Sequence, residues 1–348
     1  MDDLSLLREM IQIYSPSYNE EELSSFLVEE MQRRGFTAHQ DEVGNAVAHW
    51  GEGKPQVVML GHIDTVPGEI PVRTENGSLY GRGSVDAKGP MAAFICAADA
   101  VKDQLKYNLA LVGAVEEEEA SSLGAYHCRD KFAPNFCIIG EPSNWEGITL
   151  GYKGRFSMQY KLREEKLHYS GRRFTASMTG IEFWNKLQSW CNEYNSGKKL
   201  FDSLLPTLIT INSSDDDFHL EVELDIGLRT PPNFDNQTFQ DWVRQQAGNA
   251  TVHYSGHIPA ARNGKNNALV RSFLKSIRST GGTPRFKFKT GTSDMNIVSP
   301  VWQCPFIAYG PGDSTLDHAP NEHIEIANYH KSIDVLKQAL LNLNKVYA

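Results

Sequence analysis

Four short apolar runs constrain most strongly how this chain of 348 residues can fold. Each is compact and strongly apolar, which is typical of a strand buried on both faces of a parallel sheet. Helical patterns at 91–105 and 123–131 alternate with them. The sequence therefore predicts an α/β fold with a mostly parallel sheet covered by helices. The four runs are Val57–Leu60, Leu109–Val112, Phe136–Ile139 and Phe306–Tyr309.

A different pattern begins after Gly151 and indicates a second domain. Half-exposed strands are predicted at 154–162, 208–211, 219–228 and 251–254, and helices at 181–194 and after Asp235. This order is typical of an α+β domain with an antiparallel sheet. The α/β pattern of the first part of the chain resumes with a helix at 268–274. A length of 348 residues also exceeds what one hydrophobic core usually fills. We expect a catalytic domain of residues 1–151 and 266–348, with residues 152–265 inserted as a lid and dimerisation domain.

The charge balance bears on partners and location. The chain has 34 Lys and Arg against 43 Asp and Glu and shows no basic stripe, which argues against a nucleic-acid partner. The first residues show neither the basic stretch nor the apolar stretch of a leader sequence, and no run approaches about 18 apolar residues, so we expect no membrane partner and a cytoplasmic protein. The five cysteines are scattered and are expected to be reduced thiols.

Acids and histidines follow the predicted strands. His62 and Asp64 come after the first run, and Asp86 lies about twenty residues further on. Imidazole nitrogen together with carboxylate oxygen is a ligand mixture that zinc accepts, and the carboxyl ends of adjacent parallel strands meet. Taken alone, His62 and Asp64 are more typical of a surface loop and a turn than of a metal site. The run 116–119 of four glutamates, taken alone, is equally compatible with a solvated loop. Possible metal ligands also follow two of the other apolar runs. Glu141 comes after the run 136–139, and His318 lies beyond the run 306–309.

These motifs resemble the family of dinuclear zinc aminoacylases and exopeptidases that includes acetylornithine deacetylase, succinyl-diaminopimelate desuccinylase and glutamate carboxypeptidases. The resemblance covers nearly the whole chain and implies two zinc or cobalt ions. It implies that Asp64 orients His62 through its other ring nitrogen. The metal ligands implied are His62 and Glu141 for one ion, Glu118 and His318 for the other, and Asp86 bridging both.

The same resemblance makes Glu117 the general base, because the family places this base one residue before the glutamate that binds the second metal. A carboxylate there can take a proton from water and pass it to the leaving amine. Four consecutive glutamates, Glu116 to Glu119, also allow a register shifted by one residue in either direction.

Within the family, five segments look like the acetyl-lysine deacetylase branch, whose members free lysine or ornithine from an amino-group carrier protein. The implied reaction is hydrolysis of the amide on the α-amino group, late in lysine or arginine biosynthesis. The substrate would be a small N-acyl amino acid or a carrier-protein conjugate, and the enzyme a homodimer. An acetylornithine or acetylcitrulline deacetylase, a dipeptidase and a non-catalytic scaffold are the alternatives. The five segments are 61–68, 83–89, 115–118, 140–143 and 292–296.

Weaker matches concern the substrate. His168, in the segment His-Tyr-Ser-Gly, resembles the lid histidine that steadies the oxyanion in relatives, although a surface histidine is an equal alternative. Arg229, Lys153, Gly291 and Thr292 match positions that hold the substrate carboxylate. For Lys153, an ordinary surface cation is at least as compatible with the sequence.

Overall fold

The computed structural model describes residues 1–166 and 175–347, which form two compact units. The first unit comprises Met1–Gly151, Arg262–Phe288 and Ser293–Ala348. The second comprises Tyr152–Ala261 and Lys289–Thr292. Among the described residues, no helix is both long enough and apolar enough to cross a membrane.

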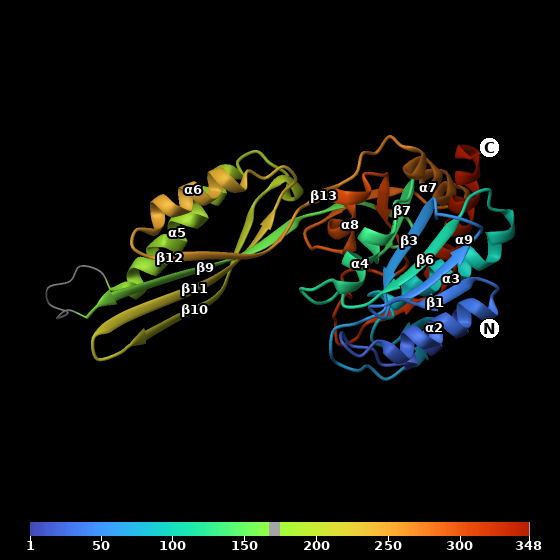
Figure 1. Ribbon diagram of the computed structural model, residues 1–348, viewed down its shortest axis with the longest axis horizontal. Helices are drawn as coiled ribbons and strands as arrows, with labels where there is room; N and C mark the ends of the chain where they lie inside the picture. The colour runs from blue at the N-terminus through green and yellow to red at the C-terminus, as the bar shows by residue number, and fades with distance from the viewer. Residues whose placement is uncertain (167–174, 348) are drawn as a thin grey trace. The chain divides into compact units, whose positions relative to one another are not determined.

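A nine-stranded mixed sheet forms the centre of the first unit (Figure 1). The predicted parallel core is confirmed, because β6, β3, β7 and β15 run parallel side by side. The flanking strands β2 and β8 run antiparallel to it. The order is β1 (Thr37–Gln40), β2 (Ala46–Trp50), β6 (Leu109–Ala114), β3 (Val57–His62), β7 (Phe136–Gly140), β15 (Phe306–Ala308), β8 (Gly147–Tyr152) and β13 (Ala261–Arg262), with β14 (Arg285–Lys289) also pairing with β8.

Helices cover this sheet, and the most buried of them is α3 (Lys88–Val101). It is rich in alanine and packs between the central strands and the helices α1 and α9. Close packing also depends on Gly140, where a Cβ would lie 3.0 Å from both the Gly61 Cα and the Phe94 ring. The other helices are α1 (Asp3–Gln12), α2 (Glu21–Arg33), α4 (Leu123–Lys131), α7 (Ala268–Ser279), α8 (Asp294–Trp302) and α9 (Ile326–Leu343).

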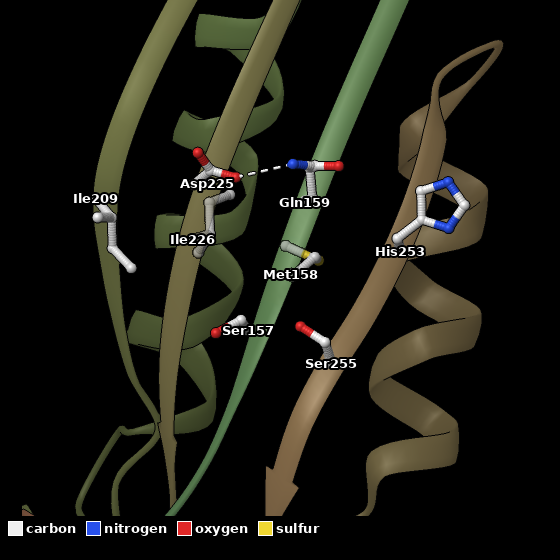
Figure 2. Close-up of a pocket in the computed structure, with 8 residues that line it drawn as sticks. All are labelled: Ser157, Met158, Gln159, Ile209, Asp225, Ile226, His253 and Ser255. Atoms are coloured by element: carbon white, nitrogen blue, oxygen red, sulfur yellow. Dashed lines mark hydrogen bonds between the residues drawn. The ribbon is translucent and has the colours of Figure 1, made fainter. Parts of the chain in front are cut away.

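The second unit is an antiparallel sheet with helices α5 (Ala176–Tyr194) and α6 (Asn236–Ala247) on one face (Figure 1). Alternate residues of β11 are buried beneath these helices, which is the period of a half-exposed strand. The sheet also carries a polar hollow of about 360 Å³. Figure 2 shows the residues that line it, among which Gln159 donates a hydrogen bond of 3.2 Å to Asp225. The strand order is β10 (Leu205–Asp215), β11 (His219–Thr230), β9 (Gly154–Glu165) and β12 (Thr251–Ile258).

Several elements differ from the sequence prediction. The predicted helix 91–105 begins earlier, at Lys88, and ends at Val101. Strand β8 was not predicted, because its glycines at 147 and 151 weaken the local strand signal. A small sheet of β4 (Arg73–Glu75), β5 (Ser78–Tyr80) and β16 (His323–Glu325) was also missed, since its strands are only three residues long and pair across the chain.

Candidate metal centre

His62 is the last residue of β3, and both of its ring nitrogens face acidic groups. Nδ1 lies 3.0 Å from the Asp64 carbonyl oxygen and 3.3 Å from its carboxylate, while Nε2 lies 3.1 Å from Asp86 Oδ1. Burial acts to lower the pKa of His62, but the bonds to Asp64 and Asp86 raise it well above the usual value. A proton held on Nδ1 by Asp64 leaves Nε2 as the nitrogen that can bind a metal.

Asp64 connects the end of β3 to the glutamate turn. It is fully buried, and its carboxylate accepts hydrogen bonds from the backbone N–H groups of Glu117 and Glu118, at 3.1 and 3.0 Å. Ser17 Oγ donates to the same carboxylate over 2.8 Å. Burial acts to raise the pKa of Asp64, yet its interactions with His62 and these donors bring it below the usual value. Asp64 therefore stays charged and positions two segments at once.

The turn after β6 separates the four glutamates. Glu116 has a φ of 57°, and its carboxylate accepts a hydrogen bond from Ser121 Oγ over 2.6 Å. Glu117 Oε2 instead lies 4.0 Å from His62 Nε2, and Glu118 Oε1 lies 2.9 Å from His318 Nε2. The left-handed backbone at Glu116 thus directs the two following side chains toward the histidines, while Glu116 is held by Ser121.

Asp86 lies between the two histidines. Its Oδ1 faces His62, and its Oδ2 lies 3.4 Å from His318 Nε2. Hydrogen bonds from His318 to Asp86 and Glu118 raise the pKa of His318 to about 10. The carboxylate is thus placed so that each oxygen can serve a different ion.

The donor atoms form two overlapping groups, each within 4.8 Å, and His62 belongs to both. One contains Glu117 and Glu141, and the other contains Asp86 and Glu118. Burial, with the nearby charges of Glu141, Asp294 and Glu118, raises the pKa of Glu117 well above the usual value. So many buried or mostly buried carboxylates around two imidazoles are unfavourable without a cation. The nitrogen and oxygen donors fit divalent ions of the zinc type.

Two buried acids of the site region had no role in the sequence prediction. Glu322 is fully buried and accepts hydrogen bonds from the backbone N–H groups of Gly83, Val85 and Asp86 and from Arg82. Asp294 begins α8, and burial raises its pKa to about 7. Both lie in motifs visible in the sequence, at 317–322 and 292–296, but their partners become apparent only in the folded chain.

The predicted substrate residues that can be located lie in the second unit. Arg229 Nη1 lies 3.4 Å from Thr292 Oγ1, and a Cβ at Gly291 would meet no atom within 4 Å among the described residues. Lys153 is fully buried, and its ammonium donates to the carbonyl oxygens of Phe201 and Ser203. The alternative of a surface cation is therefore wrong for Lys153. His168 lies outside the described residues.

Comparison with known proteins identifies the class. Residues 58–342 match the model of peptidase family M20/M25/M40, and the chain belongs to this family. An M20 family metallo-carboxypeptidase from Sulfolobus solfataricus shares the fold, with a TM-score of 0.75 at 19% identity, covering 99% of this chain and 100% of that one. Fold, family and donor set define a metal-dependent amidohydrolase.

Two relatives are considerably closer in sequence. The [LysW]-lysine hydrolase of Deinococcus radiodurans is 42% identical over 347 residues, covering 97% of this chain and 96% of the relative. A Thermococcus kodakarensis protein is 39% identical over 344 residues, covering 98% and 92%. Its name assigns it provisionally to both [LysW]-lysine and [LysW]-ornithine hydrolysis.

Proposed function

We propose that this enzyme releases lysine or ornithine from a carrier-protein conjugate by hydrolysing the amide on the α-amino group. The observation that carries the reaction type is the Glu117 carboxylate, whose side chain is only 12% exposed, within two overlapping groups of side chains that could bind metal ions. The full-length similarity to the Deinococcus radiodurans hydrolase supports the substrate class.

In this proposal, two divalent ions, zinc or cobalt, bind to five side chains. When bound, such ions polarise an amide carbonyl and make a nearby water more acidic. Asp86 would help to hold both ions, since its two oxygens face different histidines. Asp64 fixes the His62 ring and the backbone of the glutamate turn. The five side chains are His62, Asp86, Glu118, Glu141 and His318.

Glu117 acts as the general base and then as the general acid. It removes a proton from the water that attacks the amide carbon, and it returns this proton to the nitrogen as the carbon–nitrogen bond breaks. Burial raises the pKa of Glu117, which suits a group that must hold a proton between these two steps. Because Ser121 holds the Glu116 carboxylate, the geometry favours Glu117 as the base over a register one residue earlier.

The second unit would complete the substrate site and join two chains as a homodimer. Arg229 and Thr292, with the open backbone at Gly291, would bind the substrate carboxylate, since a guanidinium can hold a carboxylate through two hydrogen bonds. His168 would steady the oxyanion. Lys153 would support this part of the second unit and not contact the substrate carboxylate directly, because its ammonium is already bonded to two carbonyl oxygens. We place the enzyme in the cytoplasm.

A release assay tests the substrate. Enzyme loaded with zinc or cobalt is offered acetyl-lysine, acetyl-ornithine, a dipeptide and lysine or ornithine conjugated to the carrier protein. We expect the highest kcat/KM for a carrier conjugate. Cleavage of acetyl-ornithine or the dipeptide alone would replace this substrate with that of another family member. Metal binding without cleavage of any of them would support a non-catalytic scaffold.

A further inference from the structure

Two guanidinium groups face each other in the second unit. In the pairing of β9 with β11, Arg155 lies directly opposite Arg229, and both residues are half-buried. Their neighbours Phe156 and Leu228 are buried in the core that the sheet forms with α5 and α6, so the two arginines project from the other face. Burial and the charge of Arg155 together lower the pKa of Arg229, which shows that the two cations interact. Like charges directly opposite on adjacent strands are unfavourable unless an anion joins them.

No acid of the described residues neutralises this pair. Further along the same face of β9, Arg163 forms an ion pair with Asp216, at 3.0 Å. In residues 1–166 and 175–347, by contrast, neither Arg155 nor Arg229 has a carboxylate within ion-pairing distance. Arg229 instead contacts a neutral hydroxyl, with Thr292 Oγ1 3.4 Å from its Nη1. The described part of the chain therefore leaves two positive charges side by side without a counter-ion.

The strands on either side place apolar side chains next to the two arginines. Leu205 of β10 lies opposite Arg229, and Ile258 of β12 lies opposite Arg155. Ile258 is buried, and Leu205 is half-buried. A charge-assisted hydrogen bond is stronger in such surroundings than in open water, because the local dielectric constant is lower. An anion between these guanidiniums would therefore be held more tightly than by two exposed cations.

Small residues leave room beside the two arginines. Two residues along each strand, Gly227 lies opposite Ser157, and Ser157 lies opposite Ser255 of β12. Figure 2 shows Ser157 and Ser255 among the residues that line the hollow of about 360 Å³. Because glycine and serine are small, this row offers little steric hindrance to a ligand at the guanidiniums.

A carboxylate is the anion that these two side chains fit. Each guanidinium presents a planar fork of N–H groups, which matches the two oxygens of a carboxylate. We propose that Arg155 is a second binding group for the substrate carboxylate and that, with Arg229, it selects amides whose amine part carries a carboxylate. This inference deepens the proposed function and rests on it, since Arg229 holds that carboxylate there.

The two arginines would act by rejection as well as by attraction. An N-acyl amino acid brings a negative charge that relieves the repulsion between the guanidiniums. An amide of a simple amine brings no such charge, so it would have to bind beside two cations that stay unneutralised. The difference in binding between these two classes of amide is therefore larger with two arginines than with one.

The test uses two amides that differ only in the carboxylate, Nα-acetyl-lysine and N-acetylcadaverine. The ratio of their kcat/KM values is measured for the wild-type holoenzyme, Arg155→Gln and Arg155→Lys. The matched control is Arg163→Gln, since Arg163 is exposed on the same strand and the same face. Melting temperatures with free lysine, free cadaverine or inorganic phosphate give a second readout that needs no catalysis.

We expect Arg155→Gln to lower the preference for Nα-acetyl-lysine about 10- to 100-fold, chiefly through KM, because a charged hydrogen-bonding group is lost. Arg155→Lys should keep part of the preference, since it keeps the charge but loses the planar fork, and Arg163→Gln should keep all of it. Free lysine should raise the melting temperature of the wild type more than that of Arg155→Gln, whereas cadaverine should show no such difference.

A wild-type preference in Arg155→Gln, or an equal loss of activity toward both amides, would overturn the proposal. Stabilisation by phosphate but not by lysine would overturn it as well. If the wild-type enzyme cleaves a dipeptide but no conjugate of lysine or ornithine, the proposed function fails, and the dipeptide and its C-terminal amide then provide the ratio that tests Arg155. If the enzyme cleaves only the carrier conjugate, the melting temperatures decide the role of Arg155.

Discussion

Glu322 provides a demanding test of how the Asp86 loop is held. In Glu322→Gln, one amide oxygen can still accept from Val85 and Asp86, but an NH₂ group then faces Arg82 and the Gly83 N–H. The Arg82–Glu322 ion pair, at 2.8 Å, has side chains only 8% and 0% exposed. Breaking a buried pair on one side costs about 3 to 5 kcal/mol, because the remaining charge stays buried without its partner. We expect a loss of this size in the free energy of unfolding.

The functional consequence follows from the hydrogen bond between Glu322 and the backbone of Asp86. If Asp86 binds both ions, loosening its loop should weaken metal affinity roughly 10- to 100-fold. Urea denaturation of the metal-free protein and competition with a chromophoric chelator measure the two effects. Glu325→Gln is the matched control, since Glu325 is exposed on the adjacent strand and should change stability by less than about 0.5 kcal/mol. Wild-type stability and metal affinity in Glu322→Gln would refute this reasoning.

Three further predictions concern charge in and near the site. Because Asp86 and Glu118 raise the pKa of His318 to about 10, metal binding near neutral pH must displace a proton. Apparent zinc affinity should then rise with pH, by up to about tenfold per unit, and a pH-independent affinity would contradict the ligand assignment. Burial lowers the pKa of Lys88 to about 7, below its value of 10.5 in the unfolded chain, so the folded state loses this proton first. The metal-free wild type should therefore gain stability relative to Lys88→Met between about pH 7 and 10.5, by at most about 1.4 kcal/mol per unit; parallel stability curves would exclude this effect. Asp64→Asn should reduce zinc affinity roughly 10- to 100-fold, since it loses an acceptor for the glutamate turn, and unchanged binding in the chelator assay would argue against that support.

The sequence predicted the positions of the strands that carry the site because their signal is local. Each apolar run is short and buried, and the acid or histidine that follows it must lie at the strand end. Val57–Leu60 and Phe136–Ile139 therefore predicted where His62 and Glu141 would lie, and the structure brings both into one group of possible ligands. The antiparallel pairing of β2 and the short strands β4, β5 and β16 could not be predicted this way, since they depend on distant partners.

The details inside the site depended on tertiary contacts. Four identical glutamates carry no local signal of register. The left-handed backbone at Glu116 and the contacts of the side chains with Ser121, His62 and His318 distinguish them. Glu322 was visible in its motif, but its role required the loop 82–86 to fold over it. Lys153 was compatible with a surface position from the sequence, and only the folded chain shows that it is buried and donates to the carbonyl oxygens of Phe201 and Ser203.

The most direct test of the proposed mechanism combines metal content with lysine release in Glu117→Gln, with Glu116→Gln as the matched control. We predict that Glu117→Gln retains about two ions per chain while hydrolysis falls about 100-fold or more, because the proton acceptor is lost and the ligands remain. Glu116→Gln should retain both metals and near-normal hydrolysis, since its carboxylate contacts Ser121. Normal turnover by Glu117→Gln, or inactivity of Glu116→Gln with its metals intact, would contradict the assignment of Glu117 as the base.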